Sequence, residues 1–184
     1  MKKPPSTIDI FLQPGEFYFG DRHTCIRTVL GSCVSITMWH PKLLIGGMCH
    51  YMLPYRGRGK VNPRTHALDG RYADEAILMF FREAARAGTS PRDYEVKVFG
   101  GGNMFPQLQK RGSCRHGASK GEIEACPDVS CKNASVVHSL ASVYGFSIAA
   151  QHTGGVGHRQ VLFEVWSGNV WVKQVSPIRQ GETA

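Results

Sequence analysis

The alternation of apolar and polar residues predicts that strands dominate the first third of the chain. In residues 34–39, Val, Ile and Met alternate with Ser, Thr and Trp, which is the two-residue period of a half-buried strand. The shorter segments 16–20 and 25–30 are rich in aromatic or β-branched residues. A turn at His40-Pro41 separates the strand at 34–39 from a further apolar run at 43–53, so we expect the two to pair antiparallel.

A helical period appears twice in the rest of the chain. An apolar stripe predicts a helix over 71–87, and a second helix is predicted to begin at Asn133, a good N-cap, and to end at Gly145. Further strands are expected at these ranges: 94–99, 147–152, 160–166 and 170–175, the last two forming a hairpin. The predicted fold is α/β of the α+β type, a single domain whose largely antiparallel mixed sheet layers are covered by two main helices.

Composition fits one globular domain. The chain has 184 residues, of which 42% are hydrophobic and 20% charged, close to the globular average. Its basic N-terminus leads into polar residues and no apolar run reaches membrane-spanning length, so we expect neither a signal peptide nor membrane insertion, and a cytoplasmic location. Thiols stay reduced in the cytoplasm, so the six cysteines are interpreted as free thiols, ligands or nucleophiles.

Trp39, Trp166 and Trp171 are interpreted as packing residues, and Cys25 and Cys49 as buried thiols.

Positive charge is concentrated toward the N-terminus. Of the net charge of +8, residues 1–66 supply +6, from nine Lys or Arg against three Asp or Glu. Arg56, Arg58, Lys60 and Arg64 alternate with Gly and Pro, which describes a basic loop able to meet an acidic surface, although such a loop taken alone is more often simply solvated. A nucleic-acid partner is not expected, because no helix-turn-helix, zinc finger or aromatic-rich binding strand accompanies the charge.

The sharpest chemical feature is the segment Leu30-Gly31-Ser32-Cys33, where a strand meets two small residues and a thiol. Gly31 permits an unusual backbone angle, and small residues leave backbone N–H groups near Cys33 free to bind an oxyanion, so Gly31 and Ser32 are candidate substrate-binding residues. A lone cytosolic cysteine is more often an inert buried hydrophobe than a nucleophile. A neighbouring base changes that balance.

His50 is the best candidate for this base. It follows Cys33 by 17 residues, on a strand that would fold back beside the one that Cys33 opens. The alternative is a histidine satisfied within the core, and Cys49 is a rival nucleophile. Strand alternation places Cys49 on the face opposite His50, which favours Cys33.

At these residues the chain resembles the family of CheD chemoreceptor glutamine deamidases, with motifs in the same order from Glu16 to Val175. The motifs are Thr28-Val29-Leu30-Gly31-Ser32-Cys33-Val34, Gly46-Gly47-Met48-Cys49-His50-Tyr51-Met52-Leu53-Pro54, Arg71-Tyr72-Ala73-Asp74, Phe99-Gly100-Gly101-Gly102-Asn103-Met104-Phe105, Lys132-Asn133 and His152-Thr153-Gly154-Gly155. The resemblance implies a CheD-like domain at 16–176, between an N-terminal segment, 1–15, and a tail, 177–184. It implies hydrolysis of glutamine side chains in chemoreceptor cytoplasmic domains to glutamate, with Cys33 as nucleophile, His50 as base and Thr28 orienting the histidine, and no cofactor.

The resemblance also implies partners. The basic loop, with Arg56 and Arg58 as candidate substrate contacts, would meet receptor bundles, and a CheC-type phosphatase is a further partner of the family. Three alternatives remain: an adaptor with little catalysis, a thiol hydrolase acting on another substrate, and, least favoured, an RNA-binding domain.

One segment, at about 111–131, is longer than in the family pattern and carries Cys114, His116, Cys126 and Cys131. These residues lack the close ligand pairs of zinc sites, so a surface loop without metal is preferred.

Overall fold

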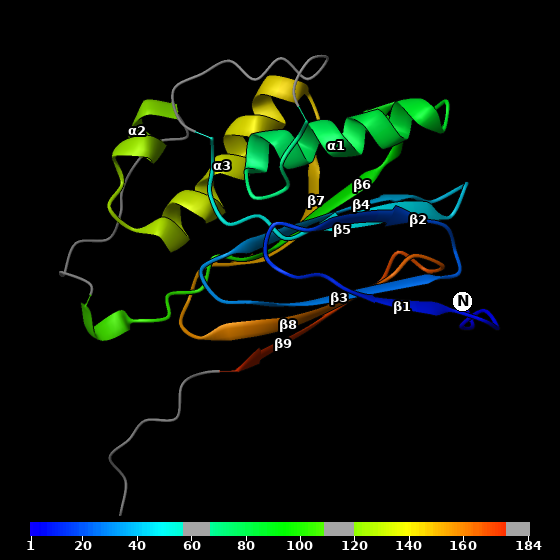
Figure 1. Cartoon of the computed structure of the whole chain (residues 1–184), viewed down its shortest axis with the longest axis horizontal. Coiled ribbons are helices and arrows are strands. Elements are labelled where there is room, and N and C mark those ends of the chain that lie inside the picture. Colours follow the sequence, from blue (N-terminus) through cyan, green and yellow to red (C-terminus); the bar gives the residue numbers. More distant parts are fainter. Residues whose placement is uncertain (57–66, 109–119, 176–184) are drawn as a thin grey trace, which may run out of the picture.

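The structure is a computed structural model that describes residues 1–56, 67–108 and 120–175. Two sheets pack face to face, and the helices cover the outer face of one of them (Figure 1). The result is a three-layer arrangement of helices, five-stranded sheet and four-stranded sheet. The predicted α+β class, with largely antiparallel mixed sheet layers, is confirmed.

The four-stranded sheet has the order β1-β3-β8-β9. Its strands are β1 (Ile8–Phe11), β3 (Thr24–Leu30), β8 (His158–Glu164) and β9 (Val170–Val175). β1 runs parallel to β3, and the other neighbours are antiparallel. The sheet therefore begins at Ile8, within the segment that the sequence placed outside the domain. A four-residue strand on a sheet edge carries too little alternation to be recognised from its pattern.

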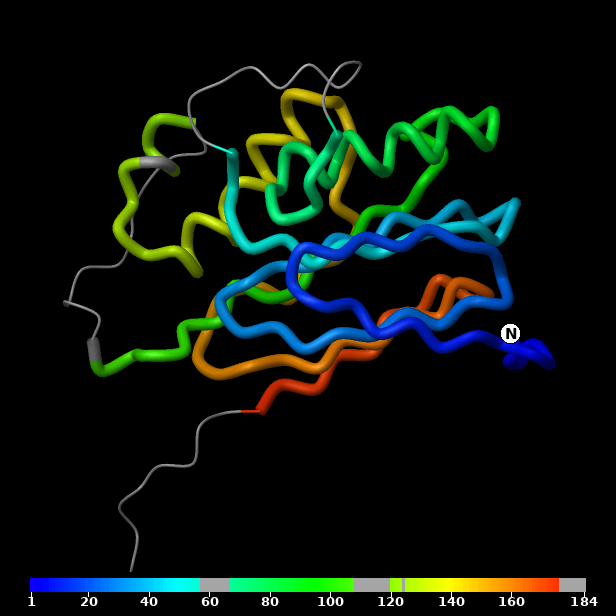
Figure 2. The backbone as a smooth tube through the Cα atoms, viewed as in Figure 1, coloured from blue at the N-terminus to red at the C-terminus, as the bar shows by residue number. Residues whose placement is uncertain are grey.

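The five-stranded sheet has the order β2-β5-β4-β6-β7. Its strands are β2 (Phe17–Gly20), β5 (Ile45–Cys49), β4 (Val34–His40), β6 (Glu95–Gly100) and β7 (Ile148–Thr153). β4 and β5 pair antiparallel across the turn at His40-Pro41, as predicted, and β6 and β7 are parallel. Figure 2 shows the chain leaving β3 in one sheet and entering β4 in the other.

The helices are α1 (Ala73–Arg86), the short α2 (Lys120–Ala125) and α3 (Val129–Tyr144), with single 3₁₀ turns η1 (Pro91–Asp93) and η2 (Pro106–Leu108). α1 confirms the first predicted helix. The predicted start of the second helix is wrong by about one turn. The Asp128 carboxylate accepts from the backbone N–H groups of Ser130 and Cys131, so this residue, and not Asn133, is the N-cap.

Two apolar cores separate the three layers. One lies between the sheets and includes Ile26, Met48 and Phe163, and the other lies between the five-stranded sheet and the helices and includes Cys49 and Phe80. Cys49 is therefore directed toward the helices, while its neighbour His50 faces the space between the sheets. Within the described ranges, no helix is long and apolar enough to cross a membrane.

Candidate active site

Cys33 lies in the turn 31–33, where the chain crosses from β3 to β4 at one end of the sheet pair (Figure 2). All three carbonyls of this turn accept hydrogen bonds. Gly102 N donates to Gly31 O at 2.8 Å, and Gly101 N donates to Cys33 O at 2.8 Å. Asn133 Nδ2 donates to Ser32 O at 3.1 Å. Fixing the carbonyls in this way also fixes the direction of the intervening N–H groups and of the Cys33 side chain.

The strand pairing brings His50 to the same face as Cys33. Val34 and Tyr51 form a bridge in which each N–H donates to the other residue's carbonyl, at 3.1 and 2.9 Å. This register sets Cys33 opposite Met52 and makes Cys33 and His50 diagonal neighbours, a position within reach of side chains in an antiparallel pair. Cys33 packs against the core between the sheets, which is the space that His50 faces.

Thr28 on β3 determines which nitrogen of His50 is free. Its Oγ1 lies 2.8 Å from His50 Nδ1 and donates to Leu12 O, also at 2.8 Å. Because a hydroxyl has a single hydrogen, Oγ1 accepts from Nδ1–H. Nε2 then carries the lone pair. This atom is buried and has no hydrogen-bond partner in the structure, which leaves an unengaged base on the face that it shares with Cys33.

Burial keeps both groups of the pair neutral at rest. Desolvation lowers the pKa of His50 from 6.5 to about 4, against weaker opposing effects of the Leu12 carbonyl and the Glu16 carboxylate. Burial likewise raises the pKa of the Cys33 thiol, although its own backbone N–H and the Ser32 hydroxyl act in the opposite direction. The resting site therefore holds a thiol and an imidazole, and Cys33 could act as a nucleophile only if its proton moved to a base such as His50.

Asn133 connects the segments that carry Cys33 and His50. Its Nδ2 donates to Ser32 O, next to Cys33, and to Met52 O at 2.7 Å, two residues beyond His50. The backbone carbonyl of Asn133 accepts from the Tyr51 hydroxyl. The sequence pattern predicts a helix cap at Asn133, because helix caps and buried structural amides use the same residue type. Only the place of Asn133 in a family motif indicates a role beyond capping, such as this bridge between two segments.

Gly100 explains part of the glycine-rich segment that follows β6. Its φ is +115°, and a Cβ placed there would lie 2.3 Å from Cys33 O. At Gly100 the backbone can therefore approach the turn 31–33 only without a side chain. A Cβ at Gly101 would instead meet α3, and one at Gly102 would meet Gly157. The close approach at Gly100 is directed at the backbone of Cys33.

The remaining predicted site residues are placed less centrally. Arg56 donates through Nε to the buried Glu75 at 2.6 Å, so its guanidinium is engaged within the protein. Arg58 lies outside the described residues, as do Cys114 and His116. Gly31 lies against Met104, whose Sδ would be 3.2 Å from a Cβ at that position. Among the described residues, no group of three or more potential ligands could hold a metal ion.

Comparison with known proteins places the chain in a family. Residues 52–174 match the family described as CheD chemotactic sensory transduction. The chain is 46% identical over 173 residues to a probable chemoreceptor glutamine deamidase CheD of Pseudomonas fluorescens, covering 94% of this chain and 88% of that protein. It is 45% identical over 174 residues to a protein of the same description from Pseudomonas syringae pv. tomato, covering 94% and 93%. The chain belongs to the CheD family.

The family model begins at Met52, but the alignments to these relatives span most of the chain. A solved structure, the hypothetical protein YfiH of Bacillus licheniformis, has a TM-score of 0.36 at 12% identity, over 77% of this chain and 49% of that one. A similarity this weak supports no inference about the site.

Proposed function

We propose that this protein is a cysteine-dependent deamidase that hydrolyses glutamine side chains of chemoreceptor cytoplasmic domains to glutamate. Membership of the CheD family supports the substrate class. The observation that carries the chemistry is the hydrogen bond from His50 Nδ1 to Thr28, which leaves Nε2 unpartnered on the face shared with Cys33. Its working location is the cytoplasm, where these receptor domains lie.

In the proposed first half-reaction, Cys33 Sγ attacks the amide carbon as His50 Nε2 takes the thiol proton. Negative charge develops on the amide oxygen, and the backbone N–H groups of Ser32 and Cys33, whose directions the hydrogen-bonded carbonyls of the turn fix, would donate to it. The C–N bond then breaks. The proton returns from Nε2 to the leaving nitrogen, ammonia departs, and a thioester to Cys33 remains.

In the second half-reaction, water attacks the thioester carbon while Nε2 accepts its proton. The C–S bond breaks, and the thiolate recovers the proton from His50. The product is a glutamate side chain. Each step needs only the thiol, the imidazole and water, so the proposal includes no cofactor. A CheC-type phosphatase is proposed as a further binding partner on family resemblance alone.

The test is mass spectrometry of a chemoreceptor cytoplasmic fragment incubated with the protein. Wild type should add about one mass unit at discrete glutamines, because an amide NH₂ is replaced by OH, and Cys33→Ala and His50→Ala should not. Cys131→Ser, which alters another partly buried thiol, is the control and should keep activity. Equal mass gain with Cys33→Ala would exclude this mechanism. No gain with wild type, together with a Cys33→Ala variant that retains its cellular effect, would identify an adaptor.

A further inference from the structure

The outer face of the four-stranded sheet is uncovered. The helices lie beyond the other sheet, and within the part of the chain that the structure describes no layer packs against this face (Figure 1). Such a face of an antiparallel sheet is normally polar, because apolar residues alternate toward the core. Here it carries Phe11, Val29 and Trp171, which are 46%, 43% and 61% exposed. Trp171 was expected to be a packing residue, and that prediction is wrong.

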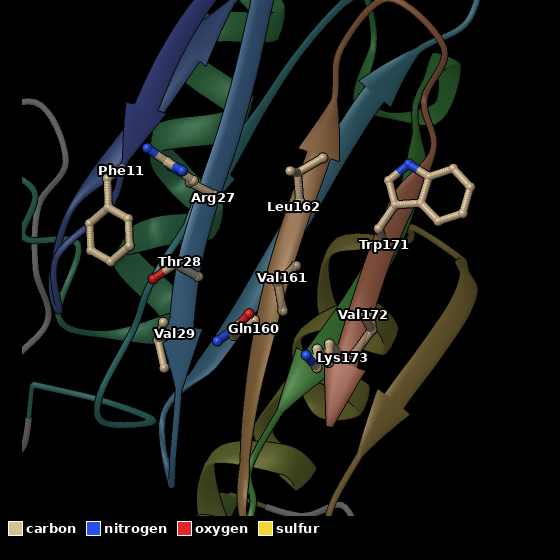
Figure 3. A pocket seen from close by; sticks show the side chains of 10 residues that line it. All are labelled: Phe11, Arg27, Thr28, Val29, Gln160, Val161, Leu162, Trp171, Val172 and Lys173. Carbon is tan, nitrogen blue, oxygen red and sulfur yellow. The ribbon is translucent and has the colours of Figure 1, made fainter. Parts of the chain in front are cut away.

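These side chains line a groove of about 460 Å³ (Figure 3). The strand registers arrange it in rows across the sheet. One row is Phe11, Arg27, Leu162 and Trp171, and the next is Val29, Gln160 and Lys173. Exposed apolar surface of this kind, with polar groups at its margin, is typical of an interaction site.

Charge defines the kind of partner. Arg27 and Lys173 lie in the two rows of the groove, and among the described residues neither forms a salt bridge or a side-chain hydrogen bond. The acidic residues of this face, Asp9 and Glu164, lie one row further from the catalytic turn, in register with Cys25. The net charge of +8 disfavours a second copy of this chain as the occupant. A partner that complements the groove would therefore present an apolar surface that also carries carboxylates.

Position relates the groove to the active site. β3 presents Arg27 and Val29 to the groove and directs Thr28, between them, inward to His50. Val29 precedes Cys33 by four residues, so the groove runs along the strand that leads into the catalytic turn. A substrate bound in the groove would extend toward Cys33.

We propose that this groove docks an acidic amphipathic helix of the protein substrate. Residues two apart on a strand are separated by about 6.6 Å, and one turn of an α-helix rises about 5.4 Å. Side chains three or four residues apart on one helix face can therefore meet successive rows. Arg27 on β3 and Lys173 on β9 lie one row and two strands apart, about 12 Å, which is the rise of seven or eight helical residues. Carboxylates two helical turns apart would pair with them, while apolar residues between pack on Leu162 and Trp171. The inference relies on the proposed function only for the identity of the substrate.

The experiment measures binding of a chemoreceptor cytoplasmic fragment to the inactive Cys33→Ala protein, followed by tryptophan fluorescence and calorimetry. Trp171 is exposed whereas Trp39 and Trp166 are buried, so a blue shift on binding should come from the groove. Adding Arg27→Glu or Trp171→Ala should weaken affinity about tenfold each, as expected for a central arginine or aromatic contact. Arg82→Glu makes the same charge change on an exposed position of α1, on the far layer, and should leave affinity unchanged.

In the active background, Arg27→Glu and Trp171→Ala should raise KM with little change in kcat, and the rate of Cys33 alkylation by iodoacetamide should stay at the wild-type value. Unchanged affinity and KM in both variants, with deamidation intact, would overturn the docking surface and leave the proposed function standing. Binding that depends on the groove, without any mass gain in the fragment, would support the docking surface and contradict the proposed deamidase function. If a single-stranded oligonucleotide bound more tightly than the receptor fragment, and Arg27→Glu abolished that binding, the occupant of the groove would be nucleic acid and not a helix.

Discussion

At the scale of single residues, the hydroxyl of Thr28 determines the chemistry available to His50. Replacing it by Thr28→Val keeps the shape of the side chain but leaves Nδ1–H and the Leu12 carbonyl without their partner. The imidazole then loses its fixed tautomer and orientation, and kcat for deamidation should fall by about 100-fold, the upper range for loss of an orienting partner. Thr28→Ser restores the hydroxyl and should recover most of the activity. Wild-type kcat in Thr28→Val would show that the hydrogen bond has no catalytic role.

The pKa of His50 predicts an unusual pH profile. The imidazole acts as a base only when neutral, and burial lowers its pKa from 6.5 to about 4. The acid limb of kcat/KM should therefore lie near pH 4, and activity should be retained at pH 6. Because the pKa of Cys33 is raised, its alkylation by iodoacetamide should accelerate throughout the alkaline range instead of reaching a plateau near neutrality. An acid limb between pH 6 and 7 would indicate that His50 is solvated in the working enzyme.

At the scale of elements, the catalytic turn depends on the segment after β6. Gly100→Ala would place a Cβ against Cys33 O in a backbone conformation that L-residues rarely adopt. We expect a loss of about 3 kcal/mol in unfolding free energy. Displacement of the turn should lower kcat by about 100-fold in the protein that remains folded. Gly121→Ala is the matched control, because nothing lies within 4 Å of a Cβ at that position. Denaturant unfolding and the mass assay measure both effects.

Sequence patterns predicted some elements of the fold correctly and failed at others. The helix α1 and the antiparallel pairing of β4 with β5 are confirmed. The prediction that β4 is half-buried is wrong, because helices cover one face of its sheet and the second sheet covers the other. β1 is short and at an edge, and the N-cap of α3 is Asp128 rather than Asn133, because Asp and Asn can both supply a capping oxygen and the pattern does not say which of them does. The bridging role of Asn133 depends on contacts with residues about 80 and 100 positions away, which no local pattern contains.

At the scale of the whole molecule, the net charge of +8 should accelerate encounter with an acidic protein substrate. Raising ionic strength from about 0.05 to 0.5 M screens that attraction, so kcat/KM for the receptor fragment should fall severalfold. Alkylation of Cys33 by the neutral reagent iodoacetamide should not change over the same range. A salt-independent kcat/KM would mean that the positive charge does not act on the substrate.

The class of the fold and its sheet layers could be anticipated, but not which strands belong to which sheet. Alternation identified inward residues on each strand, yet it does not say which strands share a sheet, since Thr28 and His50 belong to segments of different sheets. Thr28 was assigned to the site through family resemblance, and only the packing of one sheet on the other brings its hydroxyl to His50. The catalytic roles of Cys33, His50 and Thr28 stay predictions until the variants are assayed.

The pairing of β3 with β8 has a consequence for synthesis of the protein. Residues 28, 33 and 50 leave the ribosome early, but β3 gains its central partner only when residues 158–164 have been made. Gly101 and Asn133, which hold the turn, also come late relative to the nucleophile. A nascent chain therefore carries the thiol without the frame that directs it, and we expect the hydrolysis proposed for Cys33 to begin only once translation of the domain is nearly finished.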